Sequence, residues 1–188
     1  MKKLLIAFCL LATAGMAQMK LLETETSTGA TTLNLTSWYS TAYDDYQIEV
    51  VSLVPVANNV TPCINFSSNG GSTYDVSANY DNSGMYDFGG NLGAWANTGA
   101  TCWMAFGGNL GNAGGYENHA TFKLKNPAGT TNKMPFGTQL QLNAAVNWPL
   151  VMTSYCIYHT TSAVNAFQVS IQGGTGFYGT VRVYGLAK

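Results

Sequence analysis

Short runs of alternating apolar and polar residues constrain this chain more than any other feature of its sequence. In Ala30–Ser37 two leucines fall on one face of an extended strand, and Tyr46–Val54 and His119–Asn126 alternate in the same way. Gly, Asn and Pro separate these runs, and no window beyond residue 18 keeps a helical period over several turns. We therefore predict an all-β fold, an antiparallel β-sandwich of jelly-roll type with about ten short strands.

Further segments of the chain share this pattern and are also predicted to be strands. The turn Asn69-Gly70-Gly71 predicts a hairpin, because Gly and Asn accept the positive φ angles that tight turns need. The predicted strands are Val60–Ser68, Cys102–Phe106, Gln139–Val146, Leu150–His159, Val164–Gln172 and Phe177–Leu186.

The N-terminal residues 1–18 differ from the rest of the chain. Two lysines precede the apolar run Leu4–Ala12, and Gly15 and Ala17 then place small residues before Gln18. This order is typical of a secretory signal peptide, and the apolar run is too short to span a bilayer with ordinary margins. Three interpretations stay open: the segment is cleaved, it is retained, or it precedes the true start of the protein.

We accordingly divide the chain into two parts. Residues 1–18 are predicted to form a short apolar helical segment, either signal-like or anchoring. Residues 19–188 carry no linker, no charge block and no internal boundary, so they are predicted to form a single β-sandwich domain.

Charged residues are scarce in this chain, and this limits the classes of molecule that it is expected to bind. They make up 9% of the sequence, against roughly 25% in an average soluble domain, and the formal net charge is −1. No basic stripe is present, so nucleic acid is not an expected partner. Such a composition suits β-rich extracellular or particle-bound proteins.

The cysteines do not form a metal-binding pattern. Beyond the leader, Cys63, Cys102 and Cys156 are far apart and no CxxC occurs, so no metal site is predicted. An odd number of cysteines also argues against a complete disulfide framework. Buried free thiols are the first expectation. One disulfide and one free thiol are the alternative, which requires an oxidising compartment.

The hexapeptide FGGNLG occurs twice, at Phe88–Gly93 and at Phe106–Gly111. A phosphate-binding loop needs a helix after its glycines and usually a lysine, and neither copy has them. A glycine-rich calcium repeat needs aspartates where this chain has Ala, Trp or Asn. Two hairpin or crossover loops in a long glycine-rich segment are therefore predicted.

Aromatic and amide side chains are interleaved with these glycines. Aromatic rings offer flat apolar faces and amides offer paired donors and acceptors, which together suit the C–H faces and hydroxyl edges of sugars. Trp103 and Phe106 lie in an apolar run and are predicted to belong to the core. The candidate glycan-binding residues are Trp95, Asn97, Tyr86, Asn91, Asn109 and Tyr116.

Catalytic residues cannot be assembled from this sequence, so the protein is predicted not to be an enzyme and to need no cofactor. His119 and His159 are the two histidines, and each lies at the end of a predicted strand. Asp75, Asp81 and Asp87 each follow a tyrosine, a series that could gather carboxylates for glycoside hydrolysis. No nucleophile–base pair accompanies them.

Several short motifs recur in order along the chain. They are the KLL start, a Tyr-rich turn before a strand, a GGS turn, an NPAGTT loop and a VYGL ending. In these motifs the chain resembles a family of small virion proteins of tailed phages. The corresponding segments are Lys20–Leu22, Thr41–Tyr46, Ser67–Tyr74, Leu124–Thr131 and Gly176–Leu186.

The resemblance implies a β-sandwich or jelly-roll module on a phage particle, in tail fibres or as a trimeric decoration or head-fibre protein. It implies no catalytic residues. The expected partners are other virion proteins of the capsid or tail, further copies of the chain as a homotrimer, and host-surface glycans. The expected location is the virion. A secreted carbohydrate-binding module or adhesin, exported by the signal-like leader, is the alternative.

Overall fold

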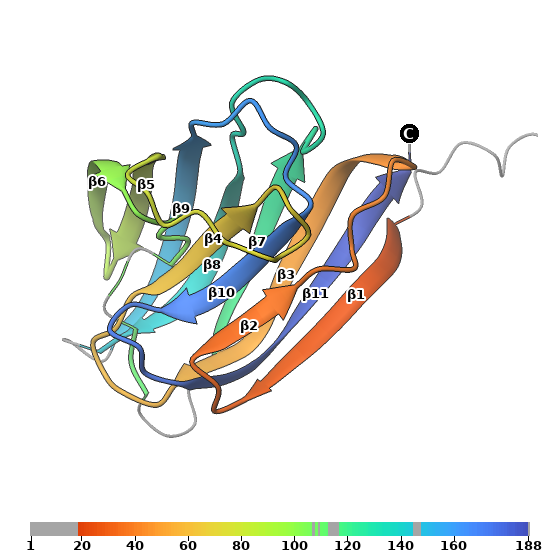
Figure 1. Ribbon diagram of the computed structural model, residues 1–188. Helices are drawn as coiled ribbons and strands as arrows, with labels where there is room; N and C mark the ends of the chain where they lie inside the picture. Colours follow the sequence, from red (N-terminus) through yellow and green to blue (C-terminus); the bar gives the residue numbers. More distant parts are fainter. Residues whose placement is uncertain (1–18, 107, 109, 113–116, 145–147, 188) are drawn as a thin grey trace, which may run out of the picture.

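The computed structural model describes residues 19–106, 108, 110–112, 117–144 and 148–187. Within these ranges the chain forms eleven strands in two antiparallel sheets, one of eight strands and one of three. Figure 1 shows the smaller sheet lying across one face of the larger one. The predicted all-β sandwich is thus confirmed. The predicted helical segment at residues 1–18 lies outside the described residues.

The larger sheet contains strands from both halves of the chain. Its antiparallel neighbours include the first and the last strand, β1 and β11. In spatial order it comprises β1 (Met19–Thr28), β11 (Phe177–Ala187), β3 (Tyr43–Pro55), β7 (Asn118–Lys125), β8 (Phe136–Asn143), β9 (Trp148–Tyr158), β5 (Tyr80–Phe88) and β6 (Asn91–Ala100).

The smaller sheet consists of β2 (Thr32–Leu35), β10 (Ala166–Ile171) and β4 (Pro62–Ser67), in that order. Its apolar side chains pack against the larger sheet. The ring of Trp38 meets those of Tyr46 and Phe167 at centroid distances of 4.7 and 5.7 Å. Burial of such large rings provides much of the hydrophobic stabilisation of the fold. Trp103 and Phe106 are fully buried, as the sequence predicts.

The two termini of the domain lie at one end of the sandwich. Met19 is paired with Leu186 on neighbouring strands. Because all pairs in the larger sheet are antiparallel, the turn between β5 and β6 at Gly89-Gly90 lies at the opposite end. The domain therefore has an end from which the chain enters and leaves, and a distal end that carries the first glycine-rich hexapeptide.

The two copies of FGGNLG have different structures. In the first, Gly89 and Gly90 have φ angles of 55° and 84° and form the two-residue turn of the β5–β6 hairpin. In the second, Leu110 forms an isolated bridge with Val60 and is fully buried. The prediction of a turn is confirmed for the first copy. The second copy, of which Phe106, Gly108, Leu110 and Gly111 are described, is part of a buried connection.

Two predicted elements differ from the structure. Cys102–Phe106 is not a strand but contributes only an isolated bridge between Trp103 and Ile64. The hairpin predicted at Asn69-Gly70-Gly71 is also wrong, although both glycines have positive φ. The edge of β4 is paired with Trp103 at Ile64, and the chain after the turn makes one backbone bond to β4, from Asp75 to Phe66, before it crosses to the larger sheet.

A disulfide joins Cys63 on β4 to Cys102, with the two Cα atoms 5.6 Å apart. Cys156 on β9 is a buried free thiol, and burial raises its pKa. The expectation of free thiols is therefore wrong for Cys63 and Cys102, and the alternative of one disulfide and one free thiol is correct. Residues distant in sequence meet here because Trp103 pairs with β4 beside Cys63.

The disulfide should contribute substantially to stability. It closes a loop of 39 residues, which in chain-entropy terms corresponds to about 3–4 kcal/mol. We expect the Cys63→Ala/Cys102→Ala variant to lose about that much free energy of unfolding in urea titrations. Cys156→Ala, which keeps the disulfide, serves as the control for loss of a buried sulfur. Equal sensitivity of the double variant and the wild type to a reducing agent would contradict the assignment.

Candidate functional site

The outer face of the larger sheet, which is turned away from the smaller sheet, is divided into two chemically different halves. On β1, β11, β3 and β7 most outward side chains are polar or charged, among them Thr24, Arg182, Glu49 and Lys123, and the large apolar side chains exposed there include Leu21 and Tyr178. On β8, β9, β5 and β6 large apolar side chains are exposed instead. These are Met85, Leu92, Phe136, Leu140, Val151 and Tyr155, and Met134 just before β8 is exposed as well; their exposed fractions are 37–85%.

Strand register makes these apolar residues contiguous. Phe136 pairs with Tyr155, which pairs with Ser83 on its other side. One further row is formed by Leu140, Val151, Asp87 and Leu92. We call this surface the apolar half-face: Phe136, Thr138, Leu140, Val151, Thr153, Tyr155, Ser83, Met85, Asp87, Leu92, Ala94 and Ala96. Asp87 is its only charged residue.

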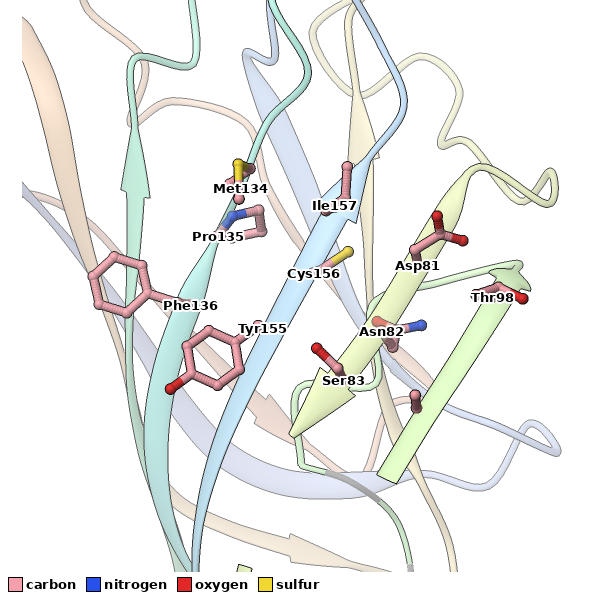
Figure 2. Close-up of a pocket in the computed structure, with 11 residues that line it drawn as sticks. Asp81, Asn82, Ser83, Thr98, Met134, Pro135, Phe136, Tyr155, Cys156 and Ile157 are labelled. Atoms are coloured by element: carbon pink, nitrogen blue, oxygen red, sulfur yellow. The ribbon is translucent and has the colours of Figure 1, made fainter. Parts of the chain in front are cut away.

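A groove of about 610 Å³ opens at one end of the apolar half-face. Figure 2 shows its wall, with Phe136 and Tyr155 adjacent on β8 and β9 and Ser83 and Thr98 on the opposite side. Met134 and Ile157 extend the apolar wall, so little of the lining is polar. A groove of this size and chemistry suits an apolar side chain or segment better than a polyhydroxylated ligand.

Asp81 is the only charged residue among those that line the groove. Its carboxylate accepts a hydrogen bond from the Gly99 amide at 2.9 Å, and its other oxygen lies 2.7 Å from His159 Nε2. The hydrogen bond with His159 holds the pKa of Asp81 below its usual value. Both oxygens of the carboxylate therefore already have partners within the protein.

The predicted series of Tyr-Asp pairs does not gather its carboxylates. Asp81 and Asp87 lie on the same strand, six residues apart, which corresponds to roughly 20 Å along an extended chain. Glycosidase carboxylates are about 5–9.5 Å apart. Asp75 lies elsewhere, with Tyr158 and Asn79 as hydrogen-bond donors to its carboxylate.

Two of the candidate glycan-binding rings pack against glycines of the β5–β6 hairpin. A Cβ atom at Gly84 would lie 2.6 Å from Trp95 Nε1, and a Cβ atom at Gly93 would overlap the ring of Tyr86. Each ring thus covers the glycine directly opposite on the neighbouring strand. Tyr86 and Trp95 share the face of the hairpin opposite to the apolar half-face, and both are half-buried.

The candidate amides occupy other positions. Asn91 begins β6 and Asn97 lies along this edge strand, and both are exposed. Asn109 and Tyr116 lie outside the described residues. The structure thus brings Tyr86 and Trp95 together on one hairpin face, with Asn91 and Asn97 on one of its strands. Their role in glycan binding stays a prediction.

The groove is not among the sites predicted from the sequence, although a signal for it is present there. The run Leu150–Ile157 is apolar at both odd and even positions, with Met152 and Cys156 facing inward and Val151 and Tyr155 outward. A strand with one face in water should alternate strictly. Apolar residues on both faces indicate that the outer face of β9 also has a packing role.

Comparisons with known proteins do not assign the chain to a family: no family model matches it, and no curated protein matches its sequence. Among the residues that the structure describes, no helix is long and apolar enough to cross a membrane. The same residues contain no group of three or more His, Cys, Asp or Glu side chains that could hold a metal ion.

The glycine–aromatic pairs of the hairpin lead to a test of its packing. At Gly84 an added methyl group would also lie 2.6 Å from the carbonyl oxygen of Thr153, so it would strain the β5–β9 pairing. We expect Gly84→Ala to lower the free energy of unfolding by about 1–3 kcal/mol in chemical denaturation. Gly89→Asn, at a positive φ that Asn tolerates, should leave stability nearly unchanged. Equal stability of both variants would contradict this packing.

Proposed function

We propose that the chain is a non-enzymatic structural protein of a phage virion, displayed on the particle as a capsid-decoration, head-fibre or tail-fibre module. The motifs that resemble small tailed-phage virion proteins coincide with structural junctions, which supports this proposal. Thr41–Tyr46 leads into β3, Ser67–Tyr74 forms the turn after β4, and Leu124–Thr131 ends β7. Gly176–Leu186 spans β11, which pairs with both β1 and β3.

A jelly-roll topology is part of this proposal. In a jelly roll a long hairpin folds over on itself, so that the first strand pairs with the last and the second with the penultimate one. Here β1 pairs with β11 and β2 with β10, β3 lies between β11 and β7, and β4 lies between β10 and Trp103. The hairpins β5–β6 and β8–β9 then extend the larger sheet beyond β7.

The apolar half-face is the observation that carries the proposal, because it fits a protein built from packed copies. Its six large apolar side chains and the adjacent Met134 together expose on the order of 800 Å², about what each partner of a standard interface buries. Because the surface has a single charged residue, copies can face one another without clusters of like charge. We therefore propose that the chain assembles with itself through this face, as a homotrimer.

The position of the two ends suits display on a particle. Residues before Met19 join the domain at the end where β11 also finishes, and the Gly89-Gly90 turn lies at the other end. We propose that the first end faces the other virion proteins of the capsid or tail. The distal end then faces outward, where Asn91 beside the Gly89-Gly90 turn is placed to meet host-surface glycans, with Trp95 further along the same strand.

Charged substitutions in the apolar half-face test this assembly. Val151→Lys/Tyr155→Lys places two positive charges on the exposed face of β9, where each copy would have to bury them. We expect a trimer for the wild type and a monomer for this variant in size-exclusion chromatography with light scattering. Thr24→Lys/Thr26→Lys on the polar half of the same sheet is the matched control and should remain trimeric.

The same proposal predicts that the chain is a stoichiometric component of particles purified from its native source, measured by quantitative mass spectrometry. If the wild-type protein is monomeric at high concentration, the proposed self-assembly through the apolar half-face is wrong. Absence of the chain from purified particles would remove the virion assignment.

A secreted carbohydrate-binding module or adhesin is the second candidate, and the Cys63–Cys102 disulfide favours it. Disulfides persist mainly in oxidising compartments, and the signal-like leader would export the chain to one. In that case the intact mass of the native protein should correspond to a chain without the leader. The protein would be monomeric, and Trp95→Ala should abolish glycan binding.

A further inference from the structure

A second concave surface lies apart from the groove and differs from it in chemistry. It is a hollow of about 380 Å³ between the end of β4, the connection from β4 to β5 and the end of β9. This volume falls within the range of small-molecule pockets, about 300–1,000 Å³. We call it the polar hollow: Phe66, Ser67, Ser68, Thr73, Tyr74, Asp75, Val76, Ser77, Tyr158 and Thr160.

Asp75 is the only charged residue of the polar hollow, and it is fixed in place. Its carboxylate accepts hydrogen bonds from the Ser77 amide, the Asn79 amide side chain and the Tyr158 hydroxyl, at 2.8–3.0 Å. Although partial burial opposes the charged form, these donors hold the pKa of Asp75 below its usual value. The backbone carbonyl of Asp75 also accepts a hydrogen bond from Asn65 at 2.8 Å. A carboxylate oxygen has further lone pairs, so a bound hydroxyl can donate to it.

The connection that forms one wall is held by its own polar side chains. Asn69 bonds to both the backbone and the hydroxyl of Thr73, at 3.0 and 2.9 Å. Ser67 Oγ accepts the Gly71 amide at 3.0 Å, and Asn165 accepts the Gly70 amide at 2.8 Å. The walls are therefore shaped before any ligand arrives, which lowers the entropic cost of binding.

The lining limits the ligands that fit. Anionic ligands are disfavoured, because Asp75 is ionised and none of the lining residues is Lys, Arg or His. The hydroxyls of Thr73 and Thr160 already accept hydrogen bonds from Asn69 and from the Ser162 amide. An apolar ligand would cover the Asp75 carboxylate and the exposed hydroxyls of Ser68 and Ser77 without offering them a hydrogen bond. A neutral polyol satisfies both conditions, since its hydroxyls bond with these groups and its C–H face can lie on a ring.

We propose that the polar hollow is a binding site for a neutral sugar unit of the size of one pyranose. Asp75 and the hydroxyls of Ser68 and Ser77 supply the polar contacts, and Tyr74 supplies a ring. None of these residues belongs to the candidate glycan set on the β5–β6 hairpin, so this is a separate site. The proposal does not depend on the virion assignment or on self-assembly.

Saturation-transfer NMR on the full-length chain tests the site with defined probes. We expect transfer to at least one of the methyl glycosides of glucose, galactose, mannose and N-acetylglucosamine. N-acetylneuraminic acid, an anionic sugar, should give none. Ser68→Ala/Ser77→Ala removes two exposed hydroxyls and should weaken binding of the active glycoside at least about tenfold, since each hydrogen bond contributes about 1 kcal/mol.

The control is Ser72→Ala, which removes an exposed hydroxyl of the same connection that does not line the hollow. It should bind as the wild type does, and the dispersion of methyl signals in each spectrum checks that the variants are folded. The site assignment fails if no neutral glycoside gives transfer, or if the double variant and the wild type bind equally. It also fails if N-acetylneuraminic acid binds as well as the neutral probes. Because particle composition and molar mass play no part in this measurement, either proposal can fail alone.

Discussion

The mismatch between the two sheets is the constraint on which the rest of this structure depends. Strands lie about 4.8 Å apart, so three strands of the smaller sheet cannot cover eight of the larger one. The chain around Trp103 and Leu110 helps to close the core where the smaller sheet ends. It is attached to β4 by the Ile64–Trp103 bridge and the Cys63–Cys102 disulfide.

On its other side, this irregular chain is held by β5, where the Asn82 side chain bonds to the backbone of Cys102 and Met104. Irregular backbone in a core needs such partners, because its polar groups are not paired in a sheet.

Strands with one buried face can be predicted from the sequence, and strands without that pattern cannot. In β3 the inward residues Tyr46, Ile48 and Val50 alternate with polar ones, so the prediction and the structure agree. The edge strand β1 carries few apolar residues, because it has one neighbour and a largely exposed surface. The sequence predicts a hairpin or crossover loop at the Gly89-Gly90 turn but not the strands β5 and β6 on either side of it, since positions within these strands hold Gly84 and Gly93. The aromatic rings that cover those glycines come from the opposite strand, and only the register reveals them.

The duplicated hexapeptide shows how far local sequence determines structure here. Both copies supply glycines, but Leu92 is 85% exposed and Leu110 is fully buried. Glycine permits a turn without determining the path of the chain beyond it. After the first copy the chain pairs back with β5, while Leu110 pairs with Val60 beside the smaller sheet. The two copies of the hexapeptide therefore lie in different environments, and a shared function cannot be inferred from their identical sequence.

The two candidate sites differ in how they arise from the fold. The groove depends on the register of four strands of the larger sheet, with Phe136, Tyr155, Ser83 and Ala96 in one row, and no single segment of sequence carries that row. The polar hollow depends on the failure of the predicted hairpin after β4. Trp103 pairs with β4 at Ile64, and the connection to β5 crosses between the sheets. Apart from the bond of the Asp75 amide to Phe66 of β4, side chains such as Asn65 and Asn69 bond to its backbone. Ser, Thr, Asn and Asp are the residues that provide such bonds. The same residues that make the crossing possible thus leave a polar surface at its inner side, where a polyol finds both donors and acceptors.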